Sequence, residues 1–139
     1  MAKWIRHHRL VTALACAIAL ALAVAATYAF AGGLDDTTTV TVSGTGPQVV
    51  RVALVERAVG FDVTPDVLEV EAGTHVILDV VNEGSGDHDL AFDERRRTDV
   101  LGPGETQRLD LGRITDDPTG RCTIGDHDIA GMDIDVRLT

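Results

Sequence analysis

The sequence predicts an all-β domain, a small β-sandwich, and three observations support this. Short β-branched runs alternate apolar and polar residues, as in residues 132–138, where Ile134, Val136 and Leu138 are separated by charged residues. Turn-forming residues recur about every 8–12 positions. No stretch of ten residues after residue 31 has helical periodicity. Together these features indicate an antiparallel sandwich or barrel.

The elements follow in order along the chain. The expected strands are residues 49–55, 67–70, 75–81, 88–92, 105–111 and 132–138. The expected turns and loops are residues 63–66, 71–73, 82–87, 101–104 and 116–120. Phe61 and Phe92 are the only aromatic residues after Phe30, so we expect an aliphatic core.

The first 31 residues have the pattern of an export segment. Three basic residues lie within the first nine positions, residues 10–26 are almost entirely apolar, and small residues flank position 30. Two interpretations stay open: a signal peptide cleaved after Ala31, or an uncleaved membrane anchor, since about 20 apolar residues can span a bilayer. Either one delivers the remainder outside the cytoplasm, as a periplasmic, cell-surface or secreted protein.

Residues 32–47 are rich in Gly, Thr and Asp and are expected to form a flexible linker. Within this stretch, residues 37–42 could pair as a strand, although their apolar content is low. The globular domain is expected to cover residues 48–139.

The charge of the exported part excludes one class of partner. All 22 acidic residues and nine of the 12 basic residues follow residue 31, which leaves a formal charge of −13. DNA binding needs a basic face, so we expect no nucleic-acid partner. A charge of this sign favours a soluble monomer and a partner with a basic docking face.

The exported part contains a single cysteine, so it cannot form an intramolecular disulfide, and a metal is one reason to keep such a thiol. Cys122, His127 and Met132 follow one another at intervals of five, and His88 opens an expected strand upstream. A thiolate, two imidazoles and a weak axial thioether are the ligands of a blue-copper electron-transfer site. These four residues are therefore the predicted ligands of one copper ion.

With these residues in place, the chain resembles the cupredoxins, the plastocyanin–azurin–auracyanin family of small blue-copper proteins. The resemblance covers residues 49–138, including the segment CTIGDHDIAGM and the pair His88-Asp89. It implies an eight-stranded Greek-key sandwich with copper held at one end by His88, Cys122, His127 and Met132. It also implies that electrons leave mainly through the edge of His127.

Two departures from the family pattern lead to further expectations. The family usually has aromatic residues before the cysteine, whereas residues 117–121 have none, so we expect a less shielded copper. Asp89 stands where the family often has Asn. Because a carboxylate only accepts hydrogen bonds, linking the two ligand loops would need backbone donors or the hydroxyls of Thr98 and Thr123. The added negative charge should favour Cu(II).

The remaining candidate residues are expected to have ordinary surface roles. His75 has no partner at ligand spacing and is expected on the surface. The arginines at 95–97 form the only basic cluster, which could dock an acidic partner. We expect them instead to form ion pairs with nearby acids, namely Asp93, Glu94 and Asp99.

The sequence predicts a one-electron carrier that is not an enzyme. A copper-binding or trafficking protein without a redox partner is the alternative. Multicopper oxidases and copper nitrite reductases need a second copper centre, and His75 is the one spare imidazole of the exported part. The electron donor and acceptor stay unidentified.

Overall fold

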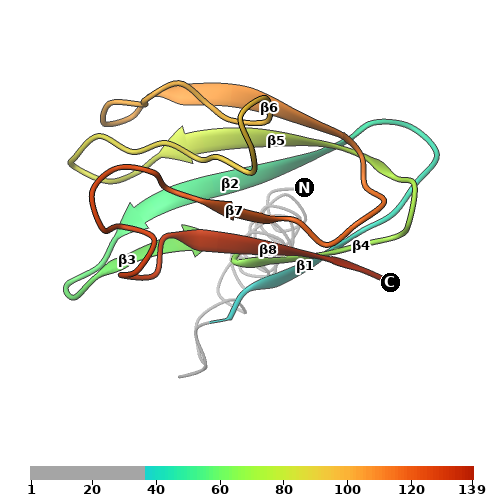
Figure 1. Ribbon diagram of the computed structural model, residues 1–139, viewed down its shortest axis with the longest axis horizontal. Coiled ribbons are helices and arrows are strands. Elements are labelled where there is room, and N and C mark those ends of the chain that lie inside the picture. The colour runs from blue at the N-terminus through green and yellow to red at the C-terminus, as the bar shows by residue number, and fades with distance from the viewer. Residues whose placement is uncertain (1–36) are drawn as a thin grey trace, which may run out of the picture. The chain divides into compact units, whose positions relative to one another are not determined.

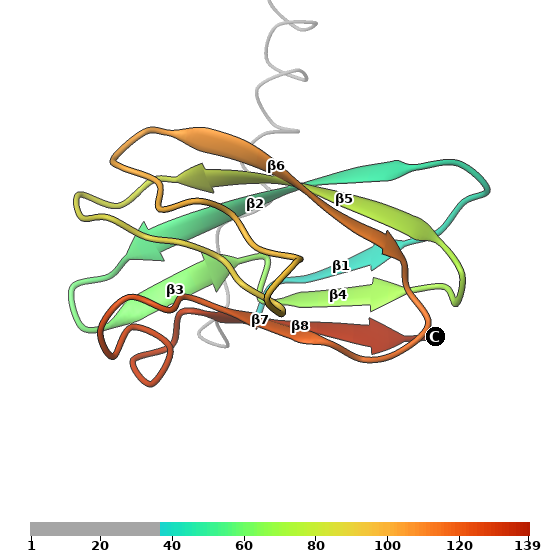
Figure 2. The same cartoon turned by 45° about the horizontal axis from the view of Figure 1, so that its top comes forward.

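A computed structural model describes residues 37–139, which form two four-stranded sheets packed face to face (Figures 1 and 2). Along the chain the strands are β1 (Thr39–Val42), β2 (Gln48–Glu56), β3 (Phe61–Thr64), β4 (Val67–Val70), β5 (His75–Asn82), β6 (Thr106–Arg113), β7 (Thr119–Arg121) and β8 (Asp133–Leu138). No helix occurs among the described residues. The prediction of an all-β sandwich is confirmed.

The two sheets have the strand orders β1-β4-β8-β7 and β3-β2-β5-β6. They are mixed, because β1 with β4, β4 with β8, and β2 with β5 pair in parallel. The sandwich is as expected, but the expected antiparallel pairing holds for only part of it. Period-2 alternation identifies a strand but does not say in which direction it runs relative to its neighbours. Here the chain repeatedly crosses from one sheet to the other, as between β4 and β5, and such crossovers allow neighbouring strands to pair in parallel.

Aliphatic side chains from both sheets fill the space between them, as expected. In β8, Ile134 is fully buried and Val136 is 2% exposed, while Asp133 and Arg137 face solvent. The alternation read from the sequence thus gives the correct buried face. The largest fully buried aliphatic side chains are Leu54, Leu68, Leu78, Leu90, Ile114 and Ile134.

The boundaries differ from expectation in four places. The turn expected at 63–66 is partly strand β3, and the turn expected at 116–120 overlaps β7. The strand expected at 88–92 consists only of isolated bridges at its residues His88 and Ala91. Part of the expected linker is strand β1, which pairs with β4.

The expected signal peptide or anchor, residues 1–31, lies outside the described residues. Within residues 37–139 there is no helix long and apolar enough to cross a bilayer.

Two long connections turn back at the same end of the sandwich. Residues 83–105 join β5 to β6, and residues 122–132 join β7 to β8. Figures 1 and 2 show both connections beside the β2–β3 hairpin. All four predicted ligands lie on these two connections, so the fold brings distant parts of the chain to one end.

Candidate metal centre

The connection between β7 and β8 folds back on itself and presents three of the predicted ligands. The backbone N–H of Cys122 donates to the carbonyl of Met132 at 3.0 Å, and the N–H of Met132 donates to the carbonyl of His127 at 2.9 Å. A third bond, from the N–H of His127 to the carbonyl of Ile124, closes a turn. These bonds bring His127 back towards Cys122, five residues earlier.

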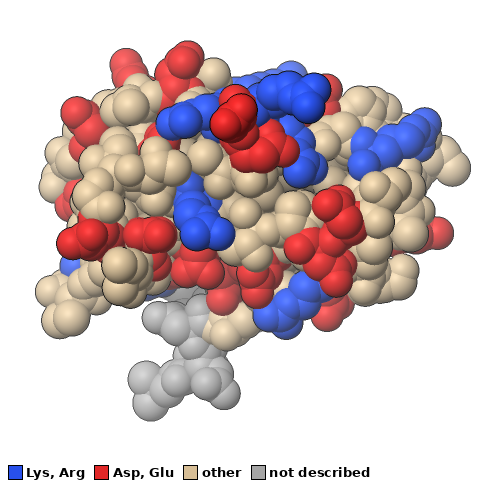
Figure 3. Space-filling model, viewed as in Figure 1, with Lys and Arg blue, Asp and Glu red and all other residues tan. Residues whose placement is uncertain are grey.

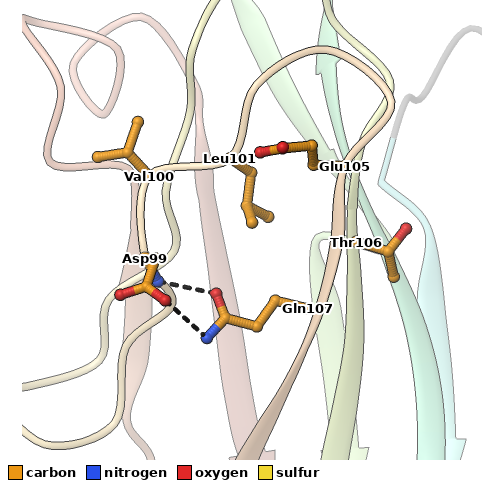
Figure 4. Close-up of a pocket in the computed structure, with 6 residues that line it drawn as sticks. All are labelled: Asp99, Val100, Leu101, Glu105, Thr106 and Gln107. Carbon is orange, nitrogen blue, oxygen red and sulfur yellow. Dashed lines mark hydrogen bonds between the residues drawn. The ribbon is translucent and has the colours of Figure 1, made fainter.

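The fourth predicted ligand, His88, is held by the segment that follows it. His88 and Leu101 exchange backbone hydrogen bonds of 3.0 and 2.7 Å. Figure 4 shows how this segment is anchored: the side chain of Gln107 in β6 accepts from the backbone N–H of Asp99 at 2.9 Å. The amide of Asn82 donates to the Leu101 carbonyl at 2.8 Å. His88 is thus fixed to β5 and β6.

Three donor side chains converge. The Nδ1 atom of His127 lies 3.1 Å from Nδ1 of His88 and 3.6 Å from Sγ of Cys122. The ligand atoms of all three residues lie within 4.8 Å of one another. Two ring nitrogens 3.1 Å apart either share a proton in a hydrogen bond or both direct their lone pairs at a cation, because two facing lone pairs repel each other. The three donor atoms are close enough together to hold one small cation.

The donors differ in exposure. His88 is fully buried and Cys122 is 1% exposed, whereas His127 is half-buried. Met132 is fully buried in the same apolar core as Cys122, and its backbone pairs with both other loop ligands. The structure therefore brings His88, Cys122 and His127 together, while the role of the Met132 thioether as an axial ligand stays a prediction.

Burial raises the pKa of the Cys122 thiol above its usual value. The thiol is therefore protonated at neutral pH until a cation binds, because a metal ligand must be the thiolate. Metal uptake at this site releases that proton.

Asp89, beside His88, joins the two ligand-bearing connections. Its buried carboxylate accepts from the backbone N–H of Thr123 at 2.5 Å and from the Thr123 hydroxyl at 2.6 Å. The expected role of Thr123 is confirmed. The Thr98 hydroxyl instead accepts from the backbone N–H of Leu90 at 3.0 Å, on its own connection, so Thr123 and not Thr98 links the two connections.

A cation that the sequence did not indicate balances Asp89. Arg97 donates to its carboxylate at 2.9 Å. Arg96 pairs with Asp93 as expected, whereas Arg97 pairs with Asp89 and not with one of the three expected acids. On the face in Figure 3, basic side chains lie among acidic ones.

An aromatic ring covers the donor side chains, but it does not come from the residues before Cys122, where the family usually has one. The ring of Phe61, the first residue of β3, stacks on the ring of His127 with centroids 4.0 Å apart. It also makes a T-shaped contact with the ring of His88, with centroids 5.5 Å apart. Gly60 and Gly131 let the hairpin approach this closely, because a Cβ on either would lie within 2.8 Å of a backbone oxygen of the opposite segment. Although residues 117–121 lack aromatics, the donors are well shielded.

Glu56, the last residue of β2, is a further residue at the site that the sequence did not indicate. Its carboxylate lies 3.3 Å from Nε2 of His88. The hydroxyl of Ser85, together with the backbone N–H of Gly86, lowers the pKa of Glu56 to about 2. It is an anion at neutral pH.

No protein-family model and no curated protein matches the sequence. Several solved structures have the same fold as this chain, although their sequence identity to it is low. Reduced rusticyanin superposes with a TM-score of 0.59 at 20% identity, covering 73% of this chain and 84% of that one. Auracyanin A, a blue copper protein from Chloroflexus aurantiacus, superposes with a TM-score of 0.53 at 12% identity, covering 68% and 100%. This chain has a cupredoxin-like fold.

The same fold occurs as part of larger proteins. A multicopper oxidase matches with a TM-score of 0.54 at 11% identity over 66% of this chain, which spans only 42% of the oxidase. In the cupredoxin-like fold of this chain, two imidazole nitrogens and one thiol converge in a buried position. This donor set fits a single type 1 copper ion.

Proposed function

We propose that this protein binds one copper ion through His88, Cys122 and His127, with Met132 as the weak axial ligand, and carries single electrons outside the cytoplasm. The observation that carries the proposal is the convergence of two Nδ1 atoms and one Sγ within 4.8 Å. Bound copper would supply a one-electron couple between Cu(I) and Cu(II).

The chain's contribution is a scaffold that changes little between the two charge states. His88 is tied to β5 and β6 through Leu101, and Cys122 is tied to Met132 at the start of β8. The Asp89–Thr123 hydrogen bonds connect the two ligand-bearing segments. A donor set held from several sides costs little reorganisation, which favours fast electron transfer.

His127 is the proposed exit for the electron, because it is the one half-buried residue of the converging three. The surface beside it combines apolar and acidic groups. Val59 and Ile129 are 94% and 83% exposed, and Asp126 and Asp128 flank the histidine. Such a surface suits a redox partner with a basic docking face.

A titration of the full chain with Cu(II) tests the proposal. We expect uptake of one ion per chain and an intense blue thiolate-to-copper absorption band. Cys122→Ser should abolish the band. His75→Ala is the matched control, because this histidine lies 2.7 Å from Asp110 on β6 and is not among the converging donors, so the band should persist. A chain that takes up no copper contradicts the proposal.

The alternative is a copper-binding or trafficking protein without a redox partner. Its signature in the same titration is a colourless complex with a tetragonal Cu(II) spectrum, since a site built for handling does not need the trigonal thiolate geometry. The burial of Cys122 and His88 favours the electron carrier, because ready exchange of an ion favours open ligands.

We also propose that the protein is not an enzyme of the multicopper type. In the described part of the chain, His75 is the one imidazole outside the converging group, and it lies at the beginning of β5 beside Asp110. One copy of this domain therefore does not supply the histidines of a second copper centre. Export rests on the pattern of residues 1–31, which serves as a signal or as a membrane tether, and the domain is proposed to act as a monomer.

A further inference from the structure

The His88 ring faces different groups on its two sides. Nδ1 points to the metal centre, 3.1 Å from Nδ1 of His127, and Nε2 lies 3.3 Å from Oε1 of Glu56. The ring itself is fully buried, and the Glu56 side chain is 30% exposed. A neutral imidazole carries one N–H and one lone pair, so the partner of one nitrogen determines what the other can do.

Glu56 is itself held in place. Its Oε2 accepts from the Ser85 hydroxyl at 2.6 Å, and its Oε1 accepts from the Gly86 N–H at 2.7 Å. Neither partner is a cation, so the carboxylate keeps its full negative charge beside His88. The carboxylate of Asp89 differs in this respect, because it pairs with Arg97.

The glycines of the connection after β5 allow this contact. A Cβ on Gly84 would lie 2.9 Å from Nε2 of His88 and 3.0 Å from Cγ of Glu56. A Cβ on Gly86 would lie 3.1 Å from Oε1 of Glu56. Asn82 fixes the loop in this form, since its side chain accepts from the Gly84 N–H and donates to the Gly86 carbonyl. The loop thus closes around the Glu56–His88 pair.

We propose that Glu56 is a positioning residue for His88: its carboxylate accepts a hydrogen bond from Nε2–H, which keeps the Nδ1 lone pair for the metal, and its negative charge favours Cu(II) over Cu(I). The inference rests on the proposed copper site and adds a residue that neither ligand spacing nor fold indicates. A carboxylate that accepts the second N–H of a ligand histidine fixes the ring and raises its basicity, and losing such a partner typically costs 10–100-fold in metal affinity.

Glu56→Gln is the direct test, because Gln keeps an acceptor oxygen of nearly the same reach and removes the charge. We expect Cu(II) affinity to fall about tenfold relative to Cu(I) affinity, which raises the reduction potential by about 59 mV for a one-electron couple. Glu83→Gln is the matched control. It removes the same charge from the connection that carries His88, but Glu83 pairs with Arg51 at 3.1 Å and not with His88.

A second measurement does not need copper. In the metal-free full chain with ¹⁵N-labelled histidine, at a pH where His88 is neutral, we expect NMR to show His88 as the Nε2–H tautomer. In Glu56→Gln we expect the Nδ1–H form to appear as well, because the amide can also donate to Nε2.

The outcomes separate the two proposals. A wild-type chain that takes up no copper overturns the proposed function, and the tautomer of His88 then still decides the role of Glu56. A blue wild-type protein whose potential changes equally in Glu56→Gln and Glu83→Gln overturns the role of Glu56 alone. A predominant Nδ1–H tautomer of His88 in the metal-free wild type overturns it as well.

Discussion

Removing the Asp89 carboxylate should destabilise the metal-free protein by about 3 kcal/mol. Asp89→Ala deletes two hydrogen bonds from Thr123, of 2.5 and 2.6 Å, and one ion pair with Arg97. Hydrogen bonds to a charged group contribute about 1.5 kcal/mol each at the low end. Because the Arg97 side chain is 46% exposed, its pair adds under about 1 kcal/mol.

Urea unfolding of the metal-free chain measures this loss. With a slope of about 1.5 kcal/mol per M, the midpoint should fall by about 2 M. Asp89→Asn keeps an acceptor for the Thr123 N–H, so it should cost only about 1 kcal/mol. Asp99→Ala is the control, because Asp99 is exposed and the bond from its backbone N–H to Gln107 survives the change, so stability should stay within about 0.5 kcal/mol.

The reasoning is refuted if Asp89→Ala loses less than about 1 kcal/mol, since the two hydrogen bonds to Thr123 then do not connect the two segments in solution. It is refuted equally if Asp89→Asn loses as much as Asp89→Ala. The charge would then matter more than the hydrogen bonds to Thr123.

Three further outcomes are expected. Phe61→Leu keeps apolar volume but removes the stacking on His127, so the free energy of unfolding should fall by about 0.5–1.5 kcal/mol, and an unchanged urea midpoint would contradict this. Met132→Gln should keep the blue band and lower the reduction potential, because an amide oxygen favours Cu(II) more than a thioether does; an unchanged potential argues against an axial Met132. Hydrogen bonding to His75 lowers the pKa of Asp110, so its contribution to stability is complete above the ordinary carboxyl pKa and is lost as pH falls through the lowered value. Asp110→Asn should therefore destabilise the protein most at about pH 6 and progressively less as the pH falls below the ordinary carboxyl pKa, as urea unfolding along a pH series would show.

The sequence predicts the long strands well and the short ones poorly. β2 and β5 carry β-branched, mostly apolar runs, and β8 has period-2 alternation. Each of the three begins and ends within a residue or two of its expected range. β3 and β7 contain or adjoin Pro, Gly and Asp, which locally favour turns. They form strands because β3 pairs with β2 and β7 pairs with β8. The local sequence of a short segment does not show which distant strand it will pair with.

Ligand identity could be predicted because the chemistry needs rare residue types at a defined spacing. Cys122 and His127 share one loop, so their spacing carries the signal, and the structure places His88 beside them. Glu56 and Phe61 gave no such signal. They belong to a hairpin near the start of the domain, and only the folded sandwich brings that hairpin against the ligand-bearing connections.

The two carboxylates at His88 have different physical effects, which changes the expectation about charge drawn from the sequence. Asp89 was expected to favour Cu(II), but Arg97 offsets its charge, and its main effect is to tie the segment of His88 to that of Thr123. Glu56 is held by a hydroxyl and a backbone N–H, which stabilise the anion without cancelling its charge. Stability of the metal-free protein should therefore depend on Asp89, whereas the relative affinity for Cu(II) should depend on Glu56.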